Sequence, residues 1–123
     1  MSILLLSADL AISSKVTGAA ARQGTPVTVA MSIDRLCELT AAATTDVLVL
    51  VDLTFPGLAI EELVPKLLSG VPSAVEIVAF GPHVHEERLA EAKRAGCHAV
   101  TSRGQFLANI DQLLMARKSP SGE

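Results

Sequence analysis

The sequence predicts an α/β fold of the doubly wound type, in which one parallel sheet of five strands lies between two layers of helices as a three-layer sandwich. Three observations support this prediction. A chain of 123 residues has room for a single core. Half of its residues are hydrophobic, which excludes a disordered chain. Short apolar runs alternate along the chain with segments of helical periodicity, and right-handed crossovers between such runs favour the strand order 2-1-3-4-5.

The expected strands are apolar runs in which hydrophobic residues do not alternate with polar ones. Continuous runs rich in Val, Ile and Leu are typical of strands that helices cover on both faces. The predicted strands are residues 3–6, 27–30, 47–51, 77–80 and the weaker run 99–101.

One helix is expected after each strand, because apolar residues recur there at spacings of three and four. Ser32 and Ser102 are suitable N-caps for the second and fifth helices. Gly24 and Gly96 can end the first and fourth helices. Pro65 should kink or shorten the third. The apolar faces consist of Ile12, Val16, Ala19 and Ala20; Ile33, Leu36, Cys37 and Thr40; Leu63, Val64, Leu67 and Leu68; Leu89, Ala92 and Ala95; and Phe106, Leu107, Ile110, Leu113 and Leu114.

The domain is predicted to occupy residues 1–115. Residues 116–123 contain turn formers and no apolar anchor, so we expect them to form a flexible C-terminal tail. Cys37 and Cys97 stand in unrelated contexts without a Cys-x-x-Cys spacing. We expect two packed thiols and neither a disulfide nor a zinc site.

The composition argues against several classes of partner. Ten Lys and Arg against thirteen Asp and Glu give a net charge of −3, which does not favour nucleic-acid binding. Three Phe, without Trp or Tyr, offer little for stacking a base, a flavin or a sugar. No run approaches the roughly 20 apolar residues of a membrane span, and the N-terminal run has no basic start and is interrupted at Asp9. We therefore expect a cytoplasmic protein that binds neither nucleic acid nor membrane.

Polar residues gather where the expected strands end. The carboxyl ends of parallel strands meet at one edge of the sheet, where open α/β sheets bind their ligands. Asp52 is the strongest candidate, because it places a carboxylate at the end of an uninterrupted apolar strand. The other candidates are Ser7, Ala8 and Asp9 after the first strand, Thr54 after the third, Gly81 and His83 after the fourth, and Ser102 and Arg103 after the fifth.

The order of these features resembles the receiver (CheY-like) domain of bacterial two-component response regulators. An Asp ends the third strand at position 52, Pro56 follows four residues later, and Ala95 and Gly96 precede the fifth strand at the expected distance. The resemblance extends from Ile3 to Leu114. It implies a flavodoxin-like fold, and it implies that Asp52 matches the residue that accepts a phosphoryl group from a histidine kinase.

At the positions of the receiver metal site, this sequence differs from the family pattern. Receivers carry two acidic residues at the end of the first strand, and these bind Mg²⁺ together with the phosphoacceptor. The matching positions here are Ser7 and Ala8, and Asp9 follows one residue later. A site with only Asp52 and Asp9 should bind Mg²⁺ weakly, because it supplies too little negative charge to compete with the water molecules that hydrate the ion.

At the positions that respond to phosphorylation in receivers, this sequence also differs from the family. Gly81 stands where the family has a Thr or Ser that binds the phosphoryl oxygen, and Val100 stands where it has an aromatic switch residue. Arg103 replaces the Lys that pairs with the phosphoryl group. Arginine keeps the charge but is not a neutral replacement. Arg103 can bind an anion beside Ser102 at the start of the last helix, or it can pair with Asp52 and close the crevice.

The histidines allow two interpretations. His83 and His85, with Glu86 and His98, could chelate Zn²⁺ or Ni²⁺. Alternatively, His85 and Glu86 begin the fourth helix, where acidic residues complement the helix dipole.

The resulting prediction is a stand-alone pseudo-receiver signalling module of a two-component or phosphorelay system. It should act through contact with a histidine kinase, a regulator or a second copy of itself, with weak or no phosphorylation of Asp52. No nucleophile lies beside a base, so we do not expect an enzyme, and no cofactor is expected beyond weakly bound Mg²⁺. Two alternatives remain open: a small-molecule or anion sensor that binds at the carboxyl edge of the sheet, and a functional phosphoreceiver with atypical metal ligands.

Overall fold

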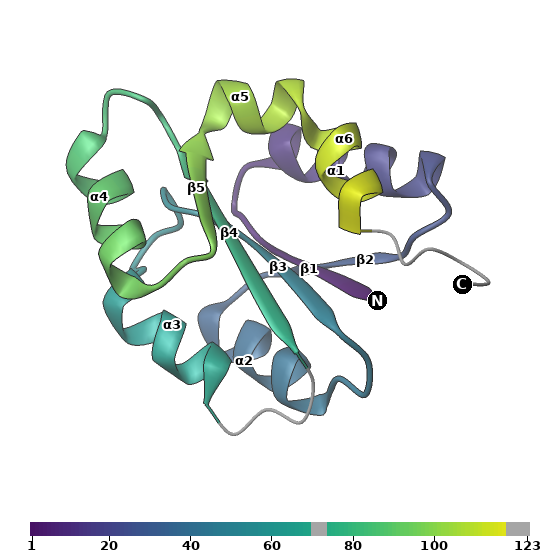
Figure 1. Ribbon diagram of the computed structural model, residues 1–123, viewed down its shortest axis with the longest axis horizontal. Helices are drawn as coiled ribbons and strands as arrows, with labels where there is room; N and C mark the ends of the chain where they lie inside the picture. The colour runs from purple at the N-terminus through teal and green to yellow at the C-terminus, as the bar shows by residue number, and fades with distance from the viewer. Residues whose placement is uncertain (70–73, 118–123) are drawn as a thin grey trace.

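A parallel five-stranded sheet in the order β2-β1-β3-β4-β5 forms the centre of the computed structural model, which describes residues 1–69 and 74–117 (Figure 1). This order confirms the sequence prediction. The fourth strand is longer than expected at both ends and includes Gly81. The strands are β1 (Ser2–Leu6), β2 (Val27–Ala30), β3 (Val47–Asp52), β4 (Val75–Gly81) and β5 (Ala99–Ser102).

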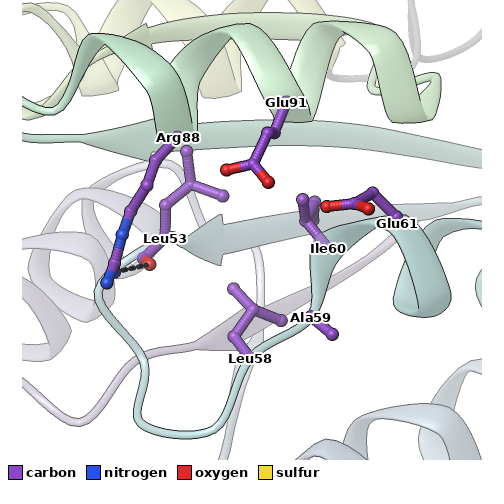
Figure 2. A pocket seen from close by; sticks show the side chains of 7 residues that line it. All are labelled: Leu53, Leu58, Ala59, Ile60, Glu61, Arg88 and Glu91. Atoms are coloured by element: carbon purple, nitrogen blue, oxygen red, sulfur yellow. Dashed lines mark hydrogen bonds between the residues drawn. The ribbon is translucent and has the colours of Figure 1, made fainter.

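Helices cover both faces of the sheet. On one face α1 packs against α5 and α6, and on the other α3 packs between α2 and α4 (Figure 1, Figure 2). None of the helices in the described ranges is long and apolar enough to cross a membrane. The helices are α1 (Leu10–Arg22), α2 (Ile33–Ala42), α3 (Ile60–Leu68), α4 (Glu86–Ala95), α5 (Arg103–Ala108) and α6 (Ile110–Arg117).

The central strand β3 is buried along its whole length and divides two cores. Val49 belongs to the core beneath α2, α3 and α4, whereas Leu50 belongs to the core beneath α1, α5 and α6. Phe80 and Phe106 stack in this second core, with ring centroids 3.9 Å apart. A strand buried on both faces needs apolar residues at every position, which explains the unbroken run in the sequence.

The predicted helix ends agree with the structure. Ser32 caps α2 by accepting a hydrogen bond from the Arg35 amide (3.1 Å). Gly24 and Gly96 follow α1 and α4 with φ of 67° and 107°, the left-handed conformation that glycine adopts without strain. Pro65 lies inside the nine-residue α3.

The last helix is two helices, not the single one predicted. Asn109 separates α5 from α6, and both its backbone N–H and its side-chain amide donate to the Gln105 carbonyl (3.0 Å each). An Asn side chain that bonds a nearby carbonyl competes with the regular helix ladder, so the chain turns at this point.

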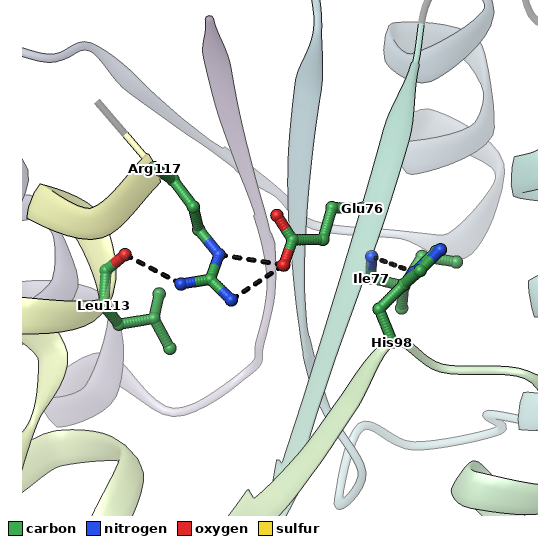
Figure 3. Close-up of polar contacts among 5 residues, drawn as sticks. All are labelled: Glu76, Ile77, His98, Leu113 and Arg117. Carbon is green, nitrogen blue, oxygen red and sulfur yellow. Dashed lines mark hydrogen bonds and ion pairs between the residues drawn. The ribbon is translucent and has the colours of Figure 1, made fainter. Parts of the chain in front are cut away.

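The last helix extends two residues beyond residue 115, where the sequence predicts the end of the domain. Helix α6 continues to Arg117, whose Nη2 and Nε donate to Glu76 Oε2 on β4 at 2.7 and 3.0 Å (Figure 3). Arg117 Nη1 also donates to the Leu113 carbonyl (3.1 Å). The predicted tail therefore begins no earlier than residue 118, and residues 118–123 lie outside the described part of the chain.

We expect Arg117→Ala to lower the free energy of unfolding by about 1 kcal/mol, since it removes a partly buried pair that fastens α6 to β4. Urea denaturation measures the change. The matched control is Arg22→Ala, which removes the more exposed pair with Asp111. The control should cost less, and equal losses from both variants would contradict the assigned role of Arg117.

Candidate functional site

The Asp52 carboxylate lies at the end of β3 and is almost completely buried, with 1% of the residue exposed. Its Oδ2 accepts a hydrogen bond from Ser7 Oγ at 2.8 Å. Its Oδ1 accepts from the Thr54 backbone N–H at 2.9 Å and from Thr54 Oγ1 at 2.6 Å. A carboxylate is costly to bury unless such bonds replace those made by water. We call Asp52, Ser7 and Thr54 the Asp52 cage.

Ser7 reaches Asp52 because β1 and β3 are neighbours that end side by side, with Leu6 opposite Val51. Ser7 is as buried as Asp52, and its Oγ also accepts a hydrogen bond from the Asp9 backbone N–H (3.1 Å). A hydroxyl has one proton to donate. Ser7 therefore donates its proton to Asp52, and a lone pair of the same oxygen accepts the hydrogen bond from the Asp9 N–H. At a position where receivers carry an acidic residue, this chain has a neutral donor that bonds the central carboxylate.

Asp9, the second predicted metal ligand, acts as the N-cap of α1. Its Oδ1 accepts hydrogen bonds from the backbone N–H groups of Ala11 (2.8 Å) and Ile12 (3.2 Å). Within residues 1–69 and 74–117, no three or more His, Cys, Asp or Glu side chains are grouped so as to hold a metal ion. Mg²⁺ requires octahedral oxygen ligands with carboxylates among them. The donors around Asp52 fit such an ion poorly, because the nearest partners are hydroxyls and a backbone amide.

Gly81 ends β4, and the side chain of Leu53 packs beside it. A Cβ placed on Gly81 would lie 3.3 Å from Leu53 Cβ and 3.6 Å from Leu53 Cδ1. Leu53 itself is buried. Gly81 has only its backbone to offer an anion at the position where receivers offer a hydroxyl to the phosphoryl group, and a side chain there would be crowded by Leu53.

Ser102 and Arg103 lie at the end of β5 and the start of α5. Ser102 Oγ accepts the Gln105 N–H (3.2 Å), so this side chain caps the helix as predicted. Arg103 is exposed, and no ion pair within the described ranges joins it to Asp52. The structure thus does not support the alternative in which Arg103 closes the crevice by pairing with Asp52.

Arg88 on α4 also contributes to the site. Its Nη1 donates to the Leu53 carbonyl at 3.0 Å, which connects α4 to the segment that follows Asp52 (Figure 2). No sequence motif signals a contact between a side chain and a backbone carbonyl 35 residues away. The only clue is that strands three and four are neighbours in the predicted sheet, so the start of the fourth helix lies near the end of the third strand.

The three histidines do not come together. His85 is the N-cap residue of α4, with Glu86 and Glu87 in the first turn, which agrees with the helix-start interpretation. His83 is exposed in the preceding loop. His98 precedes β5 at the opposite edge of the sheet, where its Nδ1 accepts the Ile77 backbone N–H at 2.9 Å (Figure 3).

Both cysteines are free thiols that are partly buried. Burial raises the pKa of the Cys97 thiol to about 11. Burial also raises the pKa of the Cys37 thiol. The positive charge of Lys66 lowers this pKa, and the negative charge of Asp34 raises it. Because the thiolate is the reactive form, raised pKa values make both residues poor nucleophiles at neutral pH.

No protein-family model and no curated protein sequence matches this chain. Solved structures do share its fold. Over 94% of this chain, the structure is similar to a CheY-like response regulator receiver domain from Methylobacillus flagellatus, with a TM-score of 0.76, 17% identity and 97% of that chain covered. It is also similar to the receiver domain of a sensor histidine kinase from Pseudomonas aeruginosa, which has a magnesium ion coordinated in its active-site cleft (TM-score 0.75, 14% identity, 94% of each chain).

A third similar structure belongs to a streptococcal family of redox sensors that is described as having evolved from two-component response regulators. The TM-score is 0.77 at 16% identity, over 94% of this chain. This chain spans 49% of the streptococcal chain, about half of its length. At these identities, the comparisons establish the CheY-like receiver fold.

The Asp52 cage can be tested with Ser7→Ala. This change leaves Asp52 Oδ2 without its donor in a buried site, so we expect the free energy of unfolding to fall by about 1 to 3 kcal/mol. Urea denaturation at neutral pH measures the loss. Ser14→Ala, an exposed serine on α1, is the matched control and should change stability by less than about 0.5 kcal/mol. Equal stability of both variants would show that the Ser7 bond contributes nothing.

Proposed function

We propose that this protein is a receiver-derived signalling module that acts by contact with a protein partner and in which Asp52 is phosphorylated weakly or not at all. The observation that carries the proposal is the Asp52 cage, in which hydroxyl and amide donors hold both carboxylate oxygens. The module is proposed to have no catalytic turnover of its own.

Phosphoryl transfer to Asp52 would need an oxygen free to attack and positive charge to neutralise the incoming group. Oδ1 already accepts two hydrogen bonds from Thr54, and the bond from Ser7 makes Oδ2 a weaker nucleophile because it stabilises the negative charge on that oxygen. Gly81 adds a second obstacle, since β4 has no hydroxyl that could donate a hydrogen bond to the phosphoryl oxygens. Arg103 supplies a cation nearby, but one arginine does not replace a divalent ion held by several carboxylates.

The proposed mode of action is protein contact, because the receiver fold supplies surfaces without needing a covalent change. In receivers the partner surface usually includes the fourth helix, the fifth strand and the fifth helix. In this chain α4 exposes Glu86, Glu87, Lys93 and Arg94 to solvent. A histidine kinase, a regulator or a second copy of this chain is the proposed partner. The streptococcal redox sensor supports the view that a receiver fold can take an input other than phosphorylation.

Incubation with acetyl phosphate and Mg²⁺, followed by intact mass measurement, tests the proposal. We expect no stoichiometric adduct of one phosphoryl group, because hydrogen bonds stabilise the Asp52 carboxylate and few charged groups stand ready to neutralise an incoming phosphoryl group. Asp52→Asn serves as the control for any trace adduct. A stoichiometric adduct on the native protein that is absent from Asp52→Asn would contradict the proposal and favour a functional phosphoreceiver with atypical ligands.

A sensor of small anions is the second candidate, and the exposed Arg103 guanidinium favours it. Within the described residues this side chain forms no ion pair with Asp52, which leaves it accessible to an anion at the carboxyl edge. The candidate predicts that inorganic phosphate raises the melting temperature of the native protein and not that of Arg103→Ala. Lys15→Ala, which removes an exposed cation from α1, should keep the response. An equal response of the native protein and Arg103→Ala would dismiss this candidate.

A further inference from the structure

The strand β2 (Val27–Ala30) forms one edge of the sheet, beside β1 (Figure 1). Within residues 1–69 and 74–117, β2 pairs with β1 and with no other strand. A strand with a single neighbour directs the N–H and C=O groups of alternate residues away from the sheet, where a strand of another molecule can pair with them. We call this unpaired side of residues 27–30 the β2 edge.

The β2 edge lacks the residues by which proteins usually protect an exposed strand. Charged side chains, above all lysine, and proline within the strand keep most edges from pairing with another molecule. Residues 23–33 contain no Asp, Glu, Lys, Arg or His, and Pro26 lies before the strand and not within it. Val27, Thr28 and Val29 are β-branched, a residue type that favours strand pairing. The sequence of the strand therefore permits a second pairing partner.

The side chains at the β2 edge are accessible and mostly apolar. Thr28 is exposed, while Val27 and Val29 are half-buried against the core beneath α1. Met31 follows the strand directly and is 71% exposed. A strand that paired with the β2 edge would extend along Met31 and remove part of this apolar surface from water.

The distribution of charge favours a second copy of this chain as the partner. With a net charge of −3, two copies repel each other on average, and the uncharged stretch 23–33 is a place where they can approach. The nearest charges along the chain are Arg22, which pairs with Asp111, and Asp34. An antiparallel copy brings the Arg22 end of one stretch toward the Asp34 end of the other, so like ends do not meet.

We propose that the β2 edge pairs antiparallel with the β2 edge of a second copy, which joins two five-stranded sheets into one. A twofold axis perpendicular to the sheet relates the copies, so opposite residues must lie on the same face. The register centred on Val29 meets this condition and places Met31 opposite Val27 of the other copy. It also keeps Pro26, which has no N–H to donate, outside the ladder.

The contact is short, and its position leaves other surfaces free. A strand of four residues buries less area than the about 1,200–2,000 Å² of stable interfaces, so the dimer should be weak and reversible. The strand β5 lies at the opposite edge of the sheet. The surface of α4, β5 and α5 therefore stays available to a kinase or a regulator. This inference rests on the proposed function, because it specifies the second copy as one partner.

Sedimentation velocity of the native chain over a range of concentrations tests the proposal, together with amide hydrogen exchange. We expect a reversible equilibrium between monomer and dimer, with slower exchange in residues 27–31 at high concentration. Thr28→Lys places two lysines near each other across the twofold axis. Because like charges in an interface are strongly unfavourable, the dissociation constant of the dimer should rise about tenfold or more.

Thr44→Lys is the matched control, since it adds the same charge at an exposed threonine between α2 and β3. It should leave the dissociation constant unchanged. A monomer at every concentration or equal dimerisation of the two variants would overturn the proposal. Growth beyond a dimer would overturn it as well, because pairing between different edges forms open chains. A phosphoryl adduct on Asp52 would instead overturn the proposed function and leave pairing at the β2 edge intact.

Discussion

The hydrogen bonds of the Asp52 cage are the constraint on which the carboxyl edge of this protein depends. A strand buried on both faces ends in a carboxylate, and a buried charge requires compensation. Ser7 and Thr54 provide it with three short hydrogen bonds. Because Ser7 directly follows β1 and also accepts the Asp9 N–H at the start of α1, one side chain connects the ends of β1 and β3 with the start of α1.

Leu53, the residue after Asp52, connects the Asp52 cage to β4 and α4. Leu53 packs beside Gly81 of β4, and its carbonyl accepts a hydrogen bond from Arg88 of α4. Both elements therefore contact the segment that carries the Asp52 cage. In a receiver, the corresponding positions hold a metal ion and respond to a phosphoryl group. Here Ser7 and Thr54 donate hydrogen bonds to Asp52, and Gly81 has no hydroxyl to offer. These differences support the proposal that the protein acts through contact with a partner and not through phosphorylation of Asp52.

Features that depend on local pattern were predictable from the sequence. The unbroken run of β3 reflects its burial on both faces, and the strand order follows from the alternation of strands and helices. Asp52, Ser7 and Gly81 were located correctly at the carboxyl edge, but their contacts were not. The break at Asn109 depends on a side chain that competes for one carbonyl.

Other contacts join residues that are distant in the sequence, and no periodicity encodes them. Arg117 bonds Glu76 across 41 positions, and Arg88 bonds the Leu53 carbonyl across 35. Each of these residues appears in the sequence as an ordinary surface charge, and only the packing of the elements shows what it contacts.

The most direct measurement of the central claim is a Mg²⁺ titration of the native protein and of Ser7→Asp, followed through the amide resonances of Asp52, Leu53 and Thr54. If a neutral hydroxyl at position 7 removes the cation site, these resonances should not respond saturably to Mg²⁺ in the native protein. They should do so in Ser7→Asp, where two carboxylates face each other and attract the ion. Saturable shifts in the native protein would contradict the account, because they would show that the Asp52 cage opens to a divalent cation.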